Sequence, residues 1–111
     1  MTYQNDRNQC LATPSIRRLE KLIQSGAADS HHVAFTKHAL ARMRQRGITR
    51  IMVLDALRLG CIRQQPEPDI RHPGVKCRME RLVSGVLVGA VVYLEYPAPD
   101  LTVVTVIDLG V

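Results

Sequence analysis

The sequence predicts an α+β domain in which two to three helices pack on one face of a three- to four-stranded antiparallel sheet. Two observations predict this fold class. Apolar residues recur at helical spacing in the first half of the 111-residue chain, whereas β-branched runs separated by turn signals fill the second half. Helices that come first and strands that come second are typical of α+β folds.

The length indicates a single domain with two regions. Residues 1–33 hold a polar arm, Met1–Ala12, followed by an amphipathic helix, and residues 34–111 form the α+β core. The helix is predicted to begin at Thr13-Pro14, a capping residue followed by proline at the first helical position, and to end at Gly26. Because the chain has no tryptophan and one phenylalanine, we expect a core of Leu, Val, Ile, Met and Ala.

Two further helices are predicted, each enclosed between a capping threonine and a glycine. The first follows Thr36 and ends at Gly47. The second follows Thr49 and runs to about Leu59, before Gly60. Apolar residues cover much of the circumference of the second helix, which predicts that it is the most buried of the three and packs against the sheet.

The remaining chain predicts a meander of strands. A proline-rich stretch between the first two strands is predicted as an irregular loop, since proline cannot donate to a strand ladder. Ser84-Gly85 and the Pro97–Asp100 segment are predicted as the two turns. The predicted strands are Cys61–Gln65, Val75–Val83, Val86–Tyr96 and Leu101–Leu109.

Positive charge is concentrated in the helical half of the chain. Residues 1–60 carry ten Lys/Arg and four Asp/Glu, whereas residues 61–111 carry five and six. From Phe35 to Ile51 there are five bases and no acid. This asymmetry favours a polyanionic partner, either RNA or an acidic protein such as an antitoxin; the alternative is a basic protein with no specific partner. The oligomeric state stays open.

Cysteine usage and hydropathy predict a cytoplasmic protein. The three cysteines Cys10, Cys61 and Cys77 form no CxxC pair, and the last two lie in strand-like segments as small hydrophobic residues. No signal peptide is expected, because residues 1–12 have no apolar run. The longest apolar run, Val86–Tyr96, is about half of the roughly 20 residues that a membrane-spanning helix needs, so no membrane is expected as a partner.

The pair His31-His32 is the first candidate for a metal site. Adjacent side chains in a loop diverge, and no cluster of Cys or Asp lies nearby in the sequence. An exposed loop pair is the favoured interpretation, so neither a metal nor another cofactor is predicted.

The strongest candidate for a functional site is the helix between Thr36 and Gly47. His38, Arg42 and Arg46 recur at every fourth position, so they fall on one helix face. Histidine titrates near neutral pH and can transfer protons, whereas arginine stays charged and can bind two phosphate oxygens with its planar fork. This combination is what phosphodiester chemistry requires.

The run from His38 to Ile48 resembles the signature of a family of small bacterial domains, domain of unknown function (DUF) family 4258. The pattern HA-x-x-R-M-x-x-R-G-I is present, and the valine-rich strand with threonine corresponds to Val103–Ile107. The resemblance extends from about Val33 to Leu109. Members are similar in layout to toxin nucleases of the RelE and barnase type. The resemblance therefore implies a metal-independent ribonuclease of a toxin–antitoxin system, with the family's polar positions carried over as His38, Arg42 and Arg46.

These residues predict a toxin-like RNA endonuclease in which His38 is the acid or base and Arg42 and Arg46 hold the phosphate. Arg81 is added to the catalytic set because it stands on the apolar face of its strand, where a charge needs a partner or a cleft. Further phosphate contacts are assigned to four bases: Lys37, Arg44, Arg50 and Arg78.

Three alternatives remain open for the sheet and loop residues. Arg81 could reach solvent at the end of its strand, which is slightly favoured over a cleft. Glu80 or Tyr93 could supply the second catalytic group that the helix lacks. His72 could reach the site from its loop, although a plain loop histidine is favoured.

The helix motif also has an alternative interpretation in which it specifies the fold. His38 could hydrogen-bond to a loop carbonyl or acid, while Arg42 and Arg46 pair with sheet acids such as Glu95 or Asp108. The chain would then be a non-catalytic interaction module that binds an acidic protein or nucleic acid through its basic helix. Stacking on a single strand is not expected, because aromatic residues are scarce.

Overall fold

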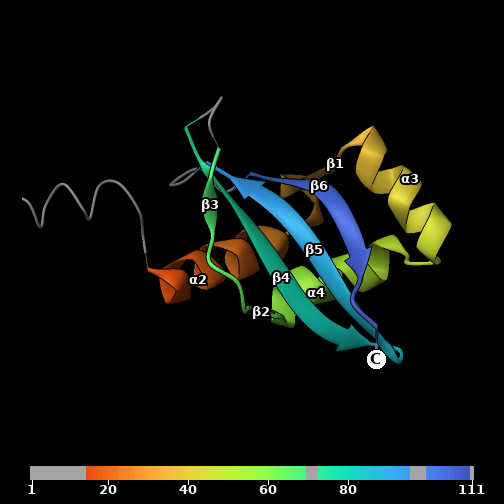
Figure 1. The fold of residues 1–111 in the computed structure, drawn as a ribbon. Helices are drawn as coiled ribbons and strands as arrows, with labels where there is room; N and C mark the ends of the chain where they lie inside the picture. The colour runs from red at the N-terminus through yellow and green to blue at the C-terminus, as the bar shows by residue number, and fades with distance from the viewer. Residues whose placement is uncertain (1–14, 70–72, 96–99, 111) are drawn as a thin grey trace, which may run out of the picture.

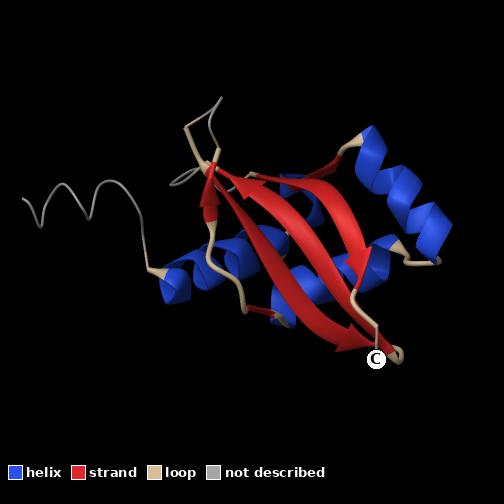
Figure 2. Cartoon of the chain, viewed as in Figure 1, coloured by secondary structure: helices blue, strands red, loops and turns tan. Residues whose placement is uncertain are grey.

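The computed structural model describes residues 15–69, 73–95 and 100–110, and shows a sheet with helices behind it (Figures 1 and 2). The α+β class is confirmed. Helix α4 packs on β4 and β5, and α2 packs on α4, so both lie on one side of the sheet. The helices are α2 (Ile16–Ala27), η1 (Ser30–His32), α3 (Lys37–Arg46) and α4 (Arg50–Leu59). The strands are β1 (Val33–Phe35), β2 (Cys61–Ile62), β3 (Glu67–Pro68), β4 (Val75–Val83), β5 (Val86–Leu94) and β6 (Leu101–Asp108).

The prediction of a three- to four-stranded antiparallel sheet is wrong in strand number and in direction. The described residues form a six-stranded sheet in the order β1-β6-β5-β4-β2, with β3 also on β4. The long strands β4, β5 and β6 form the predicted antiparallel meander, but β1 pairs with β6 in parallel. The two strands that the sequence does not predict, β1 and β3, contain three and two residues, which is too short for a visible alternation of apolar and polar residues.

Strand β3 corrects the prediction of an irregular proline loop. Glu67 pairs with Lys76 and Pro68 pairs with Val75, so a proline stands in a short strand at the sheet edge. A proline is tolerated there because its missing N–H is not needed on the solvent side. The predicted strand Cys61–Gln65 is shorter than expected and ends at Ile62.

The ends of α2 also differ from the prediction. Ser15 is the N-cap, and its hydroxyl accepts a hydrogen bond from the Arg18 N–H at 3.2 Å. Gly26 does not end the helix; it is buried, has no positive φ, and the helix continues through Ala27. A glycine ends a helix when it takes the left-handed conformation, and Gly26 does not.

The predicted ends of α3 and α4 and the hairpin turn are confirmed. Thr36 and Thr49 cap α3 and α4, and Gly47 closes α3 with φ 68°. Ser84 and Gly85 have φ values of 52° and 80°. A two-residue hairpin turn of type I′, which matches the right-handed twist of the strands, requires positive φ at both of its residues. The predicted arm Met1–Ala12, the Thr13-Pro14 start, His72, the predicted strand end Tyr96 and residues 97–99 of the second turn lie outside the described residues.

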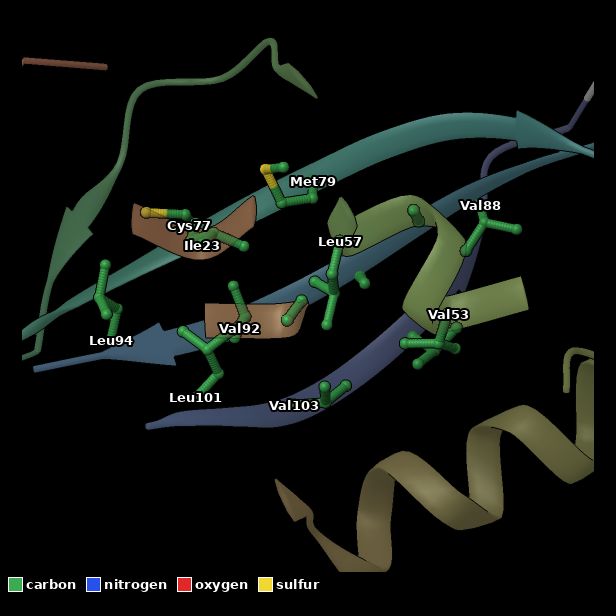
Figure 3. Packing of buried hydrophobic residues seen from close by; sticks show 14 of the residues in the cluster. Ile23, Val53, Leu57, Cys77, Met79, Val88, Val92, Leu94, Leu101 and Val103 are labelled. Atoms are coloured by element: carbon green, nitrogen blue, oxygen red, sulfur yellow. The ribbon is translucent and has the colours of Figure 1, made fainter. Parts of the chain in front are cut away.

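The core is aliphatic, as predicted, and lies between the helices and one face of the sheet (Figure 3). Leu57 from α4 and Ile23 from α2 lie against Val92 on β5 and Met79 on β4, all fully buried. The prediction that α4 is the most buried helix is wrong, because Ile51 is 78% exposed and α2 has more buried residues. Only one flank of α4 packs on α2 and the sheet.

Candidate nucleic-acid interface

Helix α3 lies beside strand β6 of the sheet and packs there through one narrow face of the helix (Figure 1). Ala39 is fully buried and Met43 is 5% exposed, and these two residues form the face that α3 packs on the core. The opposite side of the helix is polar and open to solvent. The sequence pattern therefore leaves one broad face of α3 available to a partner.

Thr36 fixes where α3 begins. Its hydroxyl accepts a hydrogen bond from the Ala39 N–H and donates one to the Val104 carbonyl, both at 3.0 Å. Its backbone N–H donates to the Val103 carbonyl at 3.1 Å. Val104 is the extra residue of a β-bulge, because Val103 pairs with Val92 whereas Thr105 pairs with Val91. The helix cap and the bulge in β6 are thus held by one side chain.

Replacing Thr36 by valine is expected to lower the free energy of unfolding by about 1–2 kcal/mol, because the helix cap is lost and the Val104 carbonyl loses its donor. Serine at this position keeps both hydroxyl bonds, so Thr36→Ser is the matched control. Urea denaturation measures both variants. Equal stability of Thr36→Val and wild type would show that the cap contributes nothing.

Four cations of the predicted site are exposed on or beside α3, and a fifth is half-buried. We call these five residues the α3 basic face: Lys37, Arg42, Arg44, Arg46 and Arg50. None of them forms an ion pair with a carboxylate in the part of the chain that the structure describes. Their charge is therefore available for an external anion.

Two of these cations are held in place by neutral groups. The Nη1 of Arg42 donates to the Oε1 of Gln45 at 2.7 Å, and the guanidinium carbon of Arg50 lies 4.8 Å from the ring centroid of Phe35. Contacts with an amide and an aromatic ring orient a guanidinium without neutralising it. A phosphate would then bind with a smaller loss of side-chain entropy.

The alternative ion pairs between α3 and sheet acids do not form. Asp108 accepts a hydrogen bond from the Gly110 N–H, and Glu95 accepts one from the Tyr93 hydroxyl. The side chain of His38 is exposed and has no hydrogen bond or ion pair with any described residue. The interpretation in which the motif serves only to hold α3 to the sheet therefore loses its expected contacts.

Arg81 has its partner on α4, and the described residues show no hydrogen bond or ion pair between Arg81 and α3. Arg81 points to the helix-covered side of β4, where its Nε donates to the Oδ2 of Asp55 on α4 at 3.0 Å. Both side chains are about one-third exposed, so this ion pair is at the rim of the core. Arg81 meets a partner on α4, and the structure does not bring it to the α3 basic face.

Arg78 is also separate from α3. It lies on the sheet face opposite the helices, and its guanidinium contacts Glu80 through two nitrogens at 2.8 and 2.9 Å. Glu80 is 7% exposed, so its charge is largely removed from water. The stem of Arg78 crosses Gly89, where an added Cβ would lie 3.4 Å from the Arg78 Cδ. Arg78, which the sequence predicts to contact nucleic acid, is therefore engaged in a partly buried ion pair, and this pair also occupies Glu80, the alternative catalytic base.

The uncovered face of the sheet has two adjoining hollows of about 200 and 250 Å³ that share Lys76. No residue of α3 lines either of them. The first hollow includes Glu67 and Arg78, and the second includes Asp69 and Tyr93. Glu80 already neutralises Arg78, so Lys76 is the one lining base among the described residues that is not in an ion pair with Glu80.

Two groups of the sheet, Tyr93 on its uncovered face and Cys77 in the core beneath the helices, are poor proton donors or nucleophiles at neutral pH. Partial burial, together with the hydrogen bond to Glu95, raises the pKa of Tyr93. The Tyr93 hydroxyl also donates to the Pro73 carbonyl at 3.2 Å. Burial raises the pKa of Cys77 to about 11, which keeps this thiol protonated, and inert thiols are typical of structural cysteines.

The pair His31-His32 lies in the short helix η1 and contacts acids. The Nδ1 of His31 is 3.0 Å from Asp29 Oδ1, and the Nδ1 of His32 is 3.0 Å from Asp100 Oδ1. Hydrogen bonds from the backbone and side chain of His31 lower the pKa of Asp29. Within residues 15–69, 73–95 and 100–110, no group of three or more His, Cys, Asp or Glu could hold a metal ion.

Within these same ranges, every helix is too short or too polar to cross a membrane.

Comparison with known proteins assigns the family. No curated protein and no solved structure matches the chain. The family model described as "Domain of unknown function (DUF4258)" matches residues 35–108, which include α3, α4 and the strands of the sheet from β2 to β6. The resemblance to RelE and barnase toxins stays a prediction. Since the match covers about two-thirds of the sequence, the chain belongs to the DUF4258 family of domains.

Proposed function

We propose that this protein binds nucleic acid by placing backbone phosphates on the α3 basic face. One observation carries the proposal: five cations gather around one exposed helix, and no carboxylate among the described residues neutralises them. Phosphate contacts supply most of the affinity of non-specific nucleic-acid binding. Arginine forks suit phosphate oxygens, and four of the five cations are arginines.

The charge of the sheet surface favours α3 over the two hollows as the phosphate site. Glu67 borders the first hollow beside Lys76 and would repel a polyanion there. The segment from Phe35 to Ile51, in contrast, contains no acid. A polyanion is therefore attracted to the α3 side of the molecule.

Metal-independent RNA cleavage at the same surface is the second candidate function, and the exposed imidazole of His38 favours it. His38 lies one turn before Arg42, within reach of the same bound phosphate. In this reaction the imidazole would take the proton of the 2′-hydroxyl, the 2′-oxygen would attack phosphorus, and Arg42 and Arg46 would stabilise the added negative charge. The P–O5′ bond would then break to leave a 2′,3′-cyclic phosphate, and the departing 5′-oxygen would take a proton from water. Arg81 has no part in this proposal, because Asp55 holds it elsewhere. A toxin of this kind would be inhibited by an acidic antitoxin that covers the α3 basic face.

Three proteins distinguish binding from cleavage: wild type, His38→Ala and Arg42→Glu. Fluorescence anisotropy with an end-labelled RNA measures affinity, and denaturing gels of the same mixtures in EDTA measure cleavage. A binding module keeps its RNA affinity in His38→Ala and loses about tenfold in Arg42→Glu. A nuclease also cleaves the RNA as wild type and stops cleaving as His38→Ala.

Thermal unfolding of the same three proteins is the control for folding. Both substituted side chains are partly or fully exposed, so the melting temperatures are expected to stay within a few degrees of wild type. If both variants are strongly destabilised and wild type binds no RNA at low salt, the motif serves the fold and the proposal is wrong.

A further inference from the structure

We infer that the α3 basic face recognises the two phosphate rows of a nucleic-acid duplex in preference to a single strand. This inference rests on the proposed function and adds the class of ligand. It depends on how the cations are distributed around α3, on what lies between them, and on the scarcity of aromatic side chains among the described residues at this surface.

The cations lie on both flanks of the solvent-facing surface of α3. We call this surface the exposed arc; it extends around the helix from Lys37 and Arg44 to His38 and Arg42. At about 100° per residue, Lys37 and Arg44 fall together on one flank, and His38 and Arg42 fall on the other. Ala41 lies midway between the flanks, Gln45 lies beside His38, and the buried residues Ala39 and Met43 are on the opposite side. A partner that approaches the exposed arc would thus meet positive charge on both sides and the small side chain of Ala41 in the middle.

This distribution fits a surface that has two negatively charged ridges. An α-helix with its side chains is about 10–12 Å wide, which is close to the roughly 12 Å width of the major groove in a B-form duplex. An A-form duplex offers its wide, shallow minor groove between phosphate rows. A single strand has one phosphate row and would leave one flank of α3 without a partner.

The helix is also accessible in the way this docking requires. Its packing is on β6, and Figure 1 shows it at the periphery of the molecule, beside the sheet and outside the layer of α2 and α4. The five cations extend over the length of α3 and onto the first residue of α4. Ten residues at 1.5 Å each give about 15 Å, or four to five base-pair steps of 3.4 Å.

The described aromatic side chains do not provide a stacking platform for a single strand at this surface. Phe35 is half-buried and its ring is already contacted by Arg50. Tyr93 is on the uncovered face of the sheet and binds Glu95 and Pro73. Proteins that bind single strands gain affinity from bases stacked on aromatic rings, and this surface offers phosphate contacts instead.

The test compares duplexes with their own component strands at one salt concentration. The probes are end-labelled RNA and DNA of about 16 base pairs, longer than the expected contact, each as a duplex and as a single strand. We expect the preferred duplex to bind at least fivefold more tightly than its single strands. Lys37→Glu/Arg44→Glu and Arg42→Glu should each reduce this preference, since each removes one flank.

The matched control is Arg17→Glu/Lys21→Glu on α2, which reverses two exposed cations far from α3 in the sequence and should keep the duplex preference. A preference for duplex RNA or for duplex DNA over the matching single strands supports the inference. The comparison of the RNA probes with the DNA probes shows which kind of duplex the α3 basic face binds. Equal or tighter binding of single strands overturns it, while the proposed function stands. Failure of all four probes to bind at low salt overturns the proposed function as well.

Discussion

Replacing Arg78 by alanine is expected to lower the free energy of unfolding by about 3 kcal/mol and to leave nucleic-acid affinity unchanged. The guanidinium holds the carboxylate of Glu80, which is 7% exposed, through two contacts below 3 Å. Without Arg78 that charge stays buried and unpaired, and removing one partner of such a pair costs more than the pair contributes. Chemical denaturation with urea measures the loss.

Glu80→Gln in the Arg78→Ala background is the matched control for this explanation. The amide has nearly the shape of the carboxylate but no charge, so the double variant should recover a large part of the lost stability. Anisotropy with labelled RNA should give wild-type affinity for both variants after correction for the folded fraction. A stability loss below about 1 kcal/mol in Arg78→Ala would indicate that water reaches Glu80 and would contradict this explanation. A loss of RNA affinity would show instead that Arg78 belongs to the surface that binds nucleic acid.

The helix ends and the hairpin turn of this fold could be predicted from sequence because local chemistry decides them. Thr36 and Thr49 satisfy the free N–H groups of a first helical turn, and Gly47 takes a backbone conformation that other residues avoid. Ser84-Gly85 supplies two positive φ values in a row. These effects act over a few residues, so the sequence pattern contains them.

The short strands could not be predicted because their stability comes from pairing with distant residues. Val33 pairs with Leu101, and Glu67 pairs with Lys76, across a parallel and an antiparallel contact. Neither β1 nor β3 has a pattern of its own, and Pro68 argues against a strand by local rules. Tertiary context overrides local propensity in such segments.

In the candidate site, too, the sequence predicts the features that depend on local spacing and does not predict those that depend on distant contacts. The exposed row on α3 follows from helical spacing, and the open position of His38 follows from its place away from Ala39 and Met43. The partners of Arg81 and Arg78 do not follow from spacing. Asp55 reaches Arg81 because α4 packs across β4, and the sequence showed only that Arg81 stood on an apolar face. The alternation of β4 could have revealed Arg78 and Glu80 as same-face neighbours two residues apart, which is a usable signal for an ion pair.

Reversing two cations of α3 together, Arg42→Glu/Arg46→Glu, is expected to weaken nucleic-acid binding about 100-fold at low salt, or about 2.7 kcal/mol. Each substitution removes a proposed phosphate contact and places a negative charge in its position. Both side chains lack a carboxylate partner among the described residues, so no internal ion pair compensates for the change. Affinity measured at several salt concentrations should also show a salt dependence that is shallower by about two counterions.

Arg17→Glu/Lys21→Glu changes the net charge of the protein by the same amount and therefore separates a local contact from general attraction. Those two residues are exposed on α2, so the control should lose less than about threefold. Arg42→Lys/Arg46→Lys adds a second comparison, because it keeps the charge and loses the planar fork. If the α2 and α3 reversals weaken binding equally, net charge alone attracts the polyanion and α3 is not the site. If the α3 reversal alone weakens it, the phosphates of the bound nucleic acid lie against the exposed arc of α3.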